Sequence, residues 1–216
     1  MADYLDLYDY RRRVSALYRE RARAFAAGED PAPILQSFRQ GKDELFAHHP
    51  QSALDEEGRS HFQGLRYFPY NPALRVPATL TLLEQTSEQD IILGERETLT
   101  MTTIGHLHFV LAETQLTLAL YWLTLYGGGL FLPFRDTTGP RESYGGGRYL
   151  FDTIKGSEPF FPTGEFERQQ MVLDFNYAYN PSCAYDYRWV CPLAPGENHL
   201  SVALNAGERN YQSADL

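Results

Sequence analysis

Cysteine is scarce in this chain of 216 residues, which has only Cys183 and Cys191. Two cysteines are too few for the disulfide scaffold that stabilises many small secreted domains. A chain of this length does not need one, because it buries roughly 70% of its unfolded surface on folding. The composition therefore indicates a domain held together by an ordinary hydrophobic core.

Positive charge is also in short supply. The formal net charge is −9, from 28 acidic and 19 basic side chains. Nucleic acids and acidic membrane surfaces are generally bound through a basic patch. The charge balance therefore argues against both as partners and leaves the oligomeric state open.

Long apolar runs and familiar catalytic motifs are missing as well. The most apolar run, Leu116 to Leu125, falls short of the ~20 residues that a membrane span needs. The first residues, MADYLDLYDYRRR, carry charges where a signal peptide has its apolar core, so we expect a cytoplasmic protein. The chain has no GxxxxGK[ST], HExxH, GxSxG or CxxC motif, so the cofactor is left unknown.

Helical patterns dominate the first quarter of the chain. Apolar residues at helical spacing predict a helix over residues 4–27, with Asp3 as its cap and Gly28 at its end. A second helix is predicted over about residues 33–47, with Asp30 as its cap. Residues 48–60 are expected to form a loop or a short helical turn. We assign residues 1–62 to helices that pack on the rest of the chain.

Alternating apolar and polar residues follow from Leu65 onward. The predicted strands are 65–68, 75–84, 90–93, 97–103, 106–112, 115–125, 129–134, 148–152, 170–176 and 199–205. Strand 115–125 is apolar on both faces, which predicts a central position. Residues 63–216 are therefore expected to form an antiparallel β-domain, and with the helices a single folding unit. The predicted fold class is mainly β with N-terminal helices (α+β), an antiparallel β-barrel or β-sandwich of about 8–10 strands.

The segment FLPFRDTTGPRESYGGGRYL, residues 131–150, is the first candidate for function. Its polar part is longer than the two to five residues that a hairpin needs, and long loops on rigid scaffolds often carry function. Arg135 or Arg148 could bind a carboxylate or phosphate, with Asp174 orienting the guanidinium. The alternative is structural, with arginines that hydrogen-bond loop carbonyls and Asp136 capping a turn.

Residues 173–208 form the second polar region. Asp174 and Asn176 share one face of the predicted strand, and Tyr177 and Tyr179 share the other. We expect a ligand cavity at the barrel mouth, lined by Phe131, Phe134, Tyr144, Tyr149, Phe175, Tyr177 and Tyr179. The predicted ligand is a small organic molecule with a polar or anionic head. The predicted ligand-binding residues are Arg135, Arg148, Tyr149, Asp174, Asn176 and Tyr179.

Two other functions stay open. An acid–base or hydrolase-like enzyme, with or without a metal, could use Asp136 or Asp174 as a base and Tyr144 or Arg148 as the electrophilic partner. Alternatively, the polar motifs could serve only as turn contacts in a structural or interaction module. Whether the chain is an enzyme is therefore left uncertain.

Metal and thiol chemistry have weaker support. His106 and His108 share one face of a strand and could hold Zn or Fe if a third ligand approached, but exposed or hydrogen-bonded histidines are favoured. Cys183 and Cys191 could be free thiols, a disulfide or half of a metal site.

Five sequence blocks, in order and spacing, resemble the domain-of-unknown-function family number 1684. They span about Gly41 to Glu208 and read GKDELFAHHPQSAL, LPFRDTTGPRESYGGGRYL, LDFNYAYNPSCAY, CPLAPGENHL and NAGE. The resemblance implies a β-rich domain of about this length with no established activity. That family more often has Arg where this chain has Tyr177, so an anion-binding role at this position is not carried over.

Overall fold

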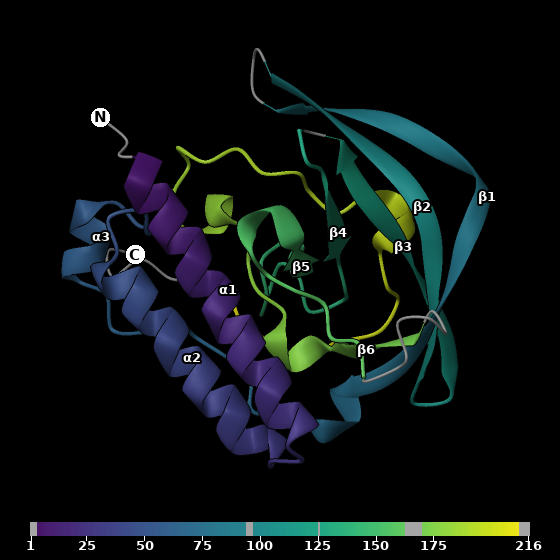
Figure 1. Cartoon of the computed structure of the whole chain (residues 1–216), viewed down its shortest axis with the longest axis horizontal. Coiled ribbons are helices and arrows are strands. Elements are labelled where there is room, and N and C mark those ends of the chain that lie inside the picture. Colours follow the sequence, from purple (N-terminus) through teal and green to yellow (C-terminus); the bar gives the residue numbers. More distant parts are fainter. Residues whose placement is uncertain (1–3, 94–96, 125, 163–169, 212–216) are drawn as a thin grey trace.

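A computed structural model of the chain describes residues 4–93, 97–124, 126–162 and 170–211. Two N-terminal helices lie along one side of a curled antiparallel sheet (Figure 1). Six strands form this sheet in the order β5-β4-β3-β2-β1-β6. The predicted fold class, mainly β with N-terminal helices and a barrel-like sheet, is confirmed.

The helices occupy nearly the predicted residues: α1 is Tyr4–Ala26, α2 is Pro31–His48 and α3 is Glu56–Ser60. The Asp30 carboxylate caps α2 as predicted, because it accepts the Ala32 N–H at 3.1 Å. The other predicted cap, Asp3, lies outside the described residues. Among the described helices, none combines the length and the apolar character that a membrane crossing requires.

Within the described residues the sheet has fewer strands than predicted, and two of its strands are longer than predicted. The strands are β1 (Arg75–Leu93), β2 (Glu97–Leu111), β3 (Thr114–Thr124), β4 (Gly129–Phe134), β5 (Arg148–Asp152) and β6 (Gln170–Asp174). β3 lies between β2 and β4, which confirms its predicted central position. The long strands β1 and β2 each contain two of the predicted strands, joined across an irregularity in pairing between Leu82 and Ser87 and another between Thr103 and Gly105.

Two predicted strands, 65–68 and 199–205, are not strands of this sheet. Each makes an isolated bridge instead, Tyr67 with Glu208 and Arg135 with His199. The alternation in 199–205 is nevertheless real, because Leu200 and Leu204 are buried in the core.

The interior of the curled sheet is a packed hydrophobic core, which contains three of the phenylalanines expected to line a ligand cavity at the barrel mouth. Phe134 and Phe175 lie in this core with ring centroids 5.3 Å apart, and neither has exposed surface. Phe131 is equally buried, in a second cluster with Tyr149. Protein interiors of this kind are close-packed, so these phenylalanines contribute to the stability of the fold.

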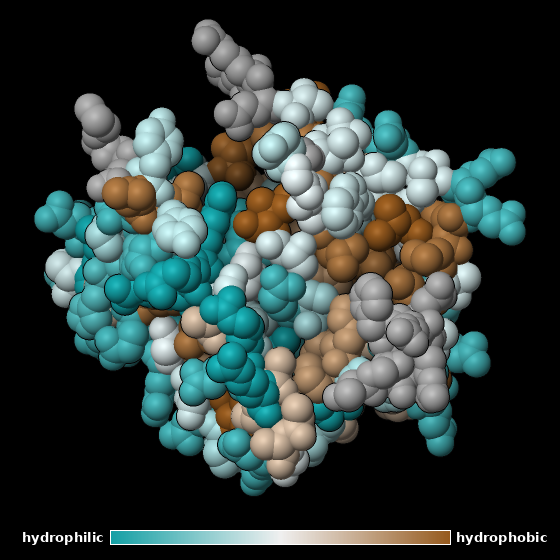
Figure 2. Space-filling view, in the orientation of Figure 1, coloured by the Kyte–Doolittle hydropathy of each residue, from teal (hydrophilic) through white to brown (hydrophobic). Residues whose placement is uncertain are grey.

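The two sides of the molecule differ in character. Hydrophilic side chains predominate over α1 and α2, whereas hydrophobic side chains gather over the sheet (Figure 2). A third hydrophobic cluster joins the sides, because Tyr18 of α1 and Phe38 of α2 pack on Tyr177. The candidate site described next lies along the same junction.

Candidate functional site

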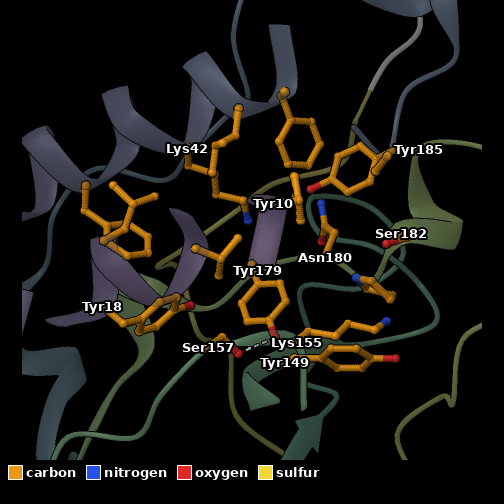
Figure 3. A pocket seen from close by; sticks show the side chains of 17 residues that line it. Tyr10, Tyr18, Lys42, Tyr149, Lys155, Ser157, Tyr179, Asn180, Ser182 and Tyr185 are labelled. Atoms are coloured by element: carbon orange, nitrogen blue, oxygen red, sulfur yellow. Dashed lines mark hydrogen bonds between the residues drawn. The ribbon is translucent and has the colours of Figure 1, made fainter. Parts of the chain in front are cut away.

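A cavity of about 90 Å³ lies where α1 and α2 meet the sheet side of the molecule (Figure 3). Its walls come from both helices, from Tyr149 in β5, from the turn that follows β5 and from residues 179–185. Lys155 lies in that turn and is exposed, so the cavity reaches the surface there.

Each helix presents one face to the cavity because the lining residues recur at helical spacing. The lining residues of α1 are Tyr10, Val14, Leu17 and Tyr18, and those of α2 are Phe38, Lys42, Leu45 and Phe46. The apolar pattern that predicted the helices therefore also builds half of the cavity.

Helix α1 comes close to the turn after β5 because Gly156 has no side chain. Gly156 lies between Lys155 and Ser157 and has a φ of +85°. A Cβ at this position would lie 2.5 Å from the Ser15 Oγ and 2.9 Å from the Arg11 carbonyl oxygen. Gly156 therefore lets α1 form one wall of the cavity.

Both lysines of the chain line this cavity, although the chain has 19 basic side chains. Lys42 forms an ion pair with Glu208, and its ammonium lies 4.7 Å from the centroid of the Tyr179 ring. The Lys155 ammonium has no hydrogen-bond or ion-pair partner within the described residues. The Lys155 ammonium therefore keeps its hydrogen-bond donors for a ligand, although its positive charge also favours the ionised forms of the nearby Asp152 carboxyl and Cys191 thiol.

Glu208 holds one wall of the cavity in place. Its side chain is 2% exposed, and its carboxylate accepts hydrogen bonds from the Lys42 ammonium, the Tyr185 hydroxyl and the Asn180 N–H. Three donors on two oxygens satisfy a buried carboxylate. Glu208 therefore fixes α2 and residues 179–185 relative to each other.

Asn180 presents an unused hydrogen-bond acceptor. The residue is buried and lines the cavity, and its Nδ2 donates to the Arg209 carbonyl at 2.8 Å. Its Oδ1 has no hydrogen-bond partner among the described residues. Leaving a buried acceptor unpaired costs about 1–3 kcal/mol. A water molecule or a ligand that donates to Oδ1 would remove this cost.

Five tyrosines give the cavity its aromatic character. Burial raises the pKa of all five, that of Tyr10 to about 12, so their hydroxyls are protonated at neutral pH. In Figure 3 the Tyr179 ring lies between the lysines, with its hydroxyl 2.7 Å from the Ser157 Oγ. The five are Tyr10, Tyr18, Tyr149, Tyr179 and Tyr185.

Two of the six residues predicted to bind a ligand line this cavity, Tyr149 and Tyr179. The structure brings them together, because their backbones exchange two hydrogen bonds of 2.8 and 3.0 Å. Their rings also meet edge to face, with centroids 5.7 Å apart. Ligand binding by these two tyrosines stays a prediction, and the cavity that they line is where a ligand would bind.

Arg148 lies in a separate, closed cluster. Its side chain is 1% exposed, forms an ion pair with Asp136 and donates to the backbone carbonyls of Leu204, Ala206 and Glu208. Burial lowers the pKa of Arg148, and the Asp136 carboxylate opposes this shift. The contacts match the structural alternative for this loop, because the guanidinium holds the C-terminal segment in place.

The other predicted binding residues also contact the chain itself. The Asn176 side chain accepts the Asn71 N–H and donates to the Asn71 carbonyl, both at 2.9 Å. Asp174 accepts the Asn176 Nδ2 at 2.9 Å and lies 3.4 Å from the Arg75 Nε, and burial raises its pKa. Arg135 pairs through its backbone with residues 198–200. None of these side chains lines the cavity.

The three catalytic candidates have different partners. Asp136 pairs with Arg148, Asp174 accepts from Asn176, and the Tyr144 hydroxyl lies 3.6 Å from the Cys183 Sγ. The structure thus distributes them over three contacts, and a catalytic role for any of them stays a prediction.

The metal candidates lie on the sheet. The rings of His106 and His108 are 6.4 Å apart, and the His108 Nδ1 lies 3.2 Å from the Thr117 Oγ1. In the described part of the chain, no three His, Cys, Asp or Glu side chains group in a way that could hold a metal ion.

Sequence reasoning missed Lys42, Lys155 and Glu208 as site residues. One signal was available, since two lysines among 19 basic side chains is an unusual proportion. Lys42 and Glu208 also lie in blocks that carry the family resemblance, but their pairing depends on a contact between residues 166 positions apart.

Comparisons with known proteins agree with the predicted family. The family model described as "Protein of unknown function (DUF1684)" matches residues 60–209. The chain is also similar to the solution NMR structure of an uncharacterized protein from Haloarcula marismortui, at 36% sequence identity and a TM-score of 0.59. This similarity covers 82% of the present chain and 92% of the archaeal one. No curated protein matches. The chain therefore belongs to the family of proteins of unknown function DUF1684.

Proposed function

We propose that this chain binds a small organic anion in the cavity between the N-terminal helices and the sheet. The observation that carries this proposal is the state of the two lysines. Lys42 is neutralised by Glu208, whereas the Lys155 ammonium has no partner within the described residues. A cation at the mouth of a tyrosine-lined cavity favours a carboxylate or another acidic group.

The chemistry of the walls narrows the ligand further. The tyrosines keep uncharged, protonated hydroxyls, so their rings favour contact with an apolar or aromatic part of the ligand. The unpaired Asn180 Oδ1 suits a hydroxyl or amine hydrogen. The ligand that satisfies both, and Lys155, is a ring with a hydroxyl or amine at one end and an acidic head at the other.

The size of the cavity sets how the ligand would lie. At about 90 Å³ it is smaller than the roughly 150 Å³ cavity that admits benzene, so the lining side chains would have to move apart for the ring to enter. The hydroxyl or amine end would enter and the acidic head would stay at the mouth, beside Lys155. This orientation keeps the charged group hydrated, which avoids the cost of burying an anion.

Native mass spectrometry of the protein purified from cells is the first test. A spectrum of the denatured sample serves as the reference. Extra mass in the native spectrum alone, and loss of that mass in a Lys155→Gln variant, are the expected result. The mass itself then gives the composition of the ligand.

A titration with defined probes tests the recognition chemistry. We expect 4-hydroxybenzoate to shift the NMR signals of Tyr179 and Asn180, and Lys155→Gln to weaken binding roughly 5- to 10-fold. The neutral analogue 4-hydroxybenzamide should bind more weakly to the wild type and be insensitive to this substitution. Arg23→Gln, which removes an exposed charge from α1, is the matched control. The proposal would be contradicted if the wild type, Lys155→Gln and Arg23→Gln all bound 4-hydroxybenzoate and 4-hydroxybenzamide with the same affinity.

A further inference from the structure

The two cysteines, which are eight residues apart in sequence, lie together beside the cavity wall. The Cys183 N–H donates a hydrogen bond to the Cys191 Sγ at 3.4 Å, so the two residues are in direct contact. Both thiols are free. The segment that joins them is at the surface, where Tyr187 is 99% exposed. The fold therefore holds two thiols side by side with a surface loop between them.

The two thiols have unequal surroundings. The hydrogen bond from Cys183 lowers the pKa of Cys191, and the positive charge of Lys155 lowers it further, although burial acts in the other direction. The same hydrogen bond, together with burial, raises the pKa of Cys183. A thiolate beside a protonated thiol is the arrangement found in reactive cysteine pairs. The geometry agrees with this order, because the Cys191 Sγ accepts the Cys183 N–H and a thiolate is the better acceptor. We therefore take Cys191 as the nucleophile and Cys183 as the second thiol.

We propose that Cys183 and Cys191 form a reversible oxidation site, at which a small peroxide converts the thiol pair into a disulfide. The Cys191 thiolate attacks one oxygen of hydrogen peroxide, the O–O bond breaks, and hydroxide leaves and takes a proton to form water. The Cys183 sulfur then attacks the resulting Cys191 sulfenic acid. An S–S bond forms as the second water leaves. The two sulfurs supply the two electrons that reduce the peroxide.

The pair is within reach of a small oxidant. Cys183 is half-buried and borders a surface groove of about 490 Å³, whose wall includes Asp55 and Arg188. Cys191 is 9% exposed. Hydrogen peroxide is little larger than water, so it can enter sites that a bulky disulfide cannot reach. Hydrogen peroxide can therefore reach the pair through this groove.

A disulfide would restrain the cavity wall, because the residue next to each cysteine either lines the cavity or contacts a residue that does. Ser182, next to Cys183, lines the cavity. Tyr149, another lining residue, donates its hydroxyl hydrogen bond to the carbonyl of Pro192, next to Cys191. Cross-linking the cysteines would fix these two points relative to each other. Oxidation itself does not depend on the proposed ligand, so the two proposals can fail separately.

Intact-mass measurement after peroxide treatment tests this proposal. The folded, reduced protein is exposed to hydrogen peroxide, and any remaining thiols are then alkylated in denaturant. We expect a loss of about 2 Da, no alkylation of either cysteine, and full reversal by dithiothreitol added to the folded protein. A peptide map of the oxidised wild type identifies the Cys183–Cys191 bond, so this part of the test needs no variant.

Single variants separate the roles of the two cysteines. Cys183→Ser should stop at the sulfenic acid, which adds about 16 Da and is trapped by dimedone. Cys191→Ser should react on the order of tenfold more slowly, because its remaining thiol is protonated. Alkylation of both cysteines at unchanged levels after peroxide would overturn the proposal. So would a disulfide already present on purification that resists reduction in the folded state, because that bond would be structural.

Discussion

The Arg148 cluster and the Lys155 cavity use positive charge in opposite ways. Arg148 is 1% exposed and donates to Asp136 and to three backbone carbonyls. In the cavity, the Lys155 ammonium and the Asn180 Oδ1 have no partners among the described residues. A buried charge with a full set of contacts rigidifies a fold, whereas polar groups left without contacts at a cavity are available to a ligand. The contacts of Arg148 support a structural role for the glycine-rich loop, and the free polar groups of the lysine-lined cavity support the proposal that it binds a ligand.

Removing Arg148 should have the largest effect on stability. Arg148→Met leaves the Asp136 carboxylate and three carbonyls buried without their donor, so we expect the free energy of unfolding to fall by about 4 kcal/mol. Urea denaturation measures this, and Arg141→Met, at an exposed position in the same loop, should change it by less than about 0.5 kcal/mol. Similar values for the two variants would break the comparison, because Arg148 would then be no more structural than a surface charge.

Removing Lys42 should cost less, since Glu208 keeps its contacts with Asn180 and Tyr185. We expect Lys42→Met to lower the free energy of unfolding by about 2–3 kcal/mol, because it leaves a buried carboxylate without its cation. The double variant Lys42→Met/Glu208→Gln should lose less than Lys42→Met alone, as a double-mutant cycle would show. Lys155→Met should stay within about 0.5 kcal/mol of the wild type. If Lys155→Met lowered the free energy of unfolding as much as Lys42→Met does, both lysines would have a structural role.

Changing Gly156 should lower the stability by less than the loss of Arg148 or Lys42. Gly156→Ala places a methyl group against Ser15 and the Arg11 carbonyl, and we expect it to cost about 1–2 kcal/mol and to move α1 outward. Amide hydrogen exchange should speed up in α1 while the strands around Arg148 keep their protection. Gly28→Ala is the matched control, because Gly28 also has a positive φ but open space around its Cβ position. Equal exchange in the two variants would mean that Gly156 does not position the helix.

Much of the fold follows from local patterns in the sequence. The two long helices were predicted within a few residues of their bounds, because apolar spacing and the Asp30 cap are local signals. The long strands β1 and β2 were each predicted as two strands, because an irregularity in pairing shifts the phase of the alternation without ending the strand. Residues 199–205 alternate like a strand, but they pack inside the curled sheet as an extended segment.

The site was harder to predict than the fold. Tyr149 and Tyr179 were identified from their position near polar segments, and they do line the cavity. Arg148 and Asn176 attracted attention for the same reason, but a sequence does not reveal that backbone carbonyls already occupy their donors. Lys42 and Lys155 are far apart in the sequence and line the same cavity only because α1 and α2 pack on the sheet.

Glu208 contacts both regions, because its carbonyl accepts from Arg148 and its carboxylate accepts from Lys42. Lys42 therefore leaves the ribosome 166 residues before its partner does. Contacts between such distant residues form late, after the entropy of closing a long loop has been overcome. During synthesis the N-terminal helices can form early, but the wall that Glu208 holds cannot be completed until the segment around residue 208 has emerged. The cavity is therefore among the last parts of this protein to assemble.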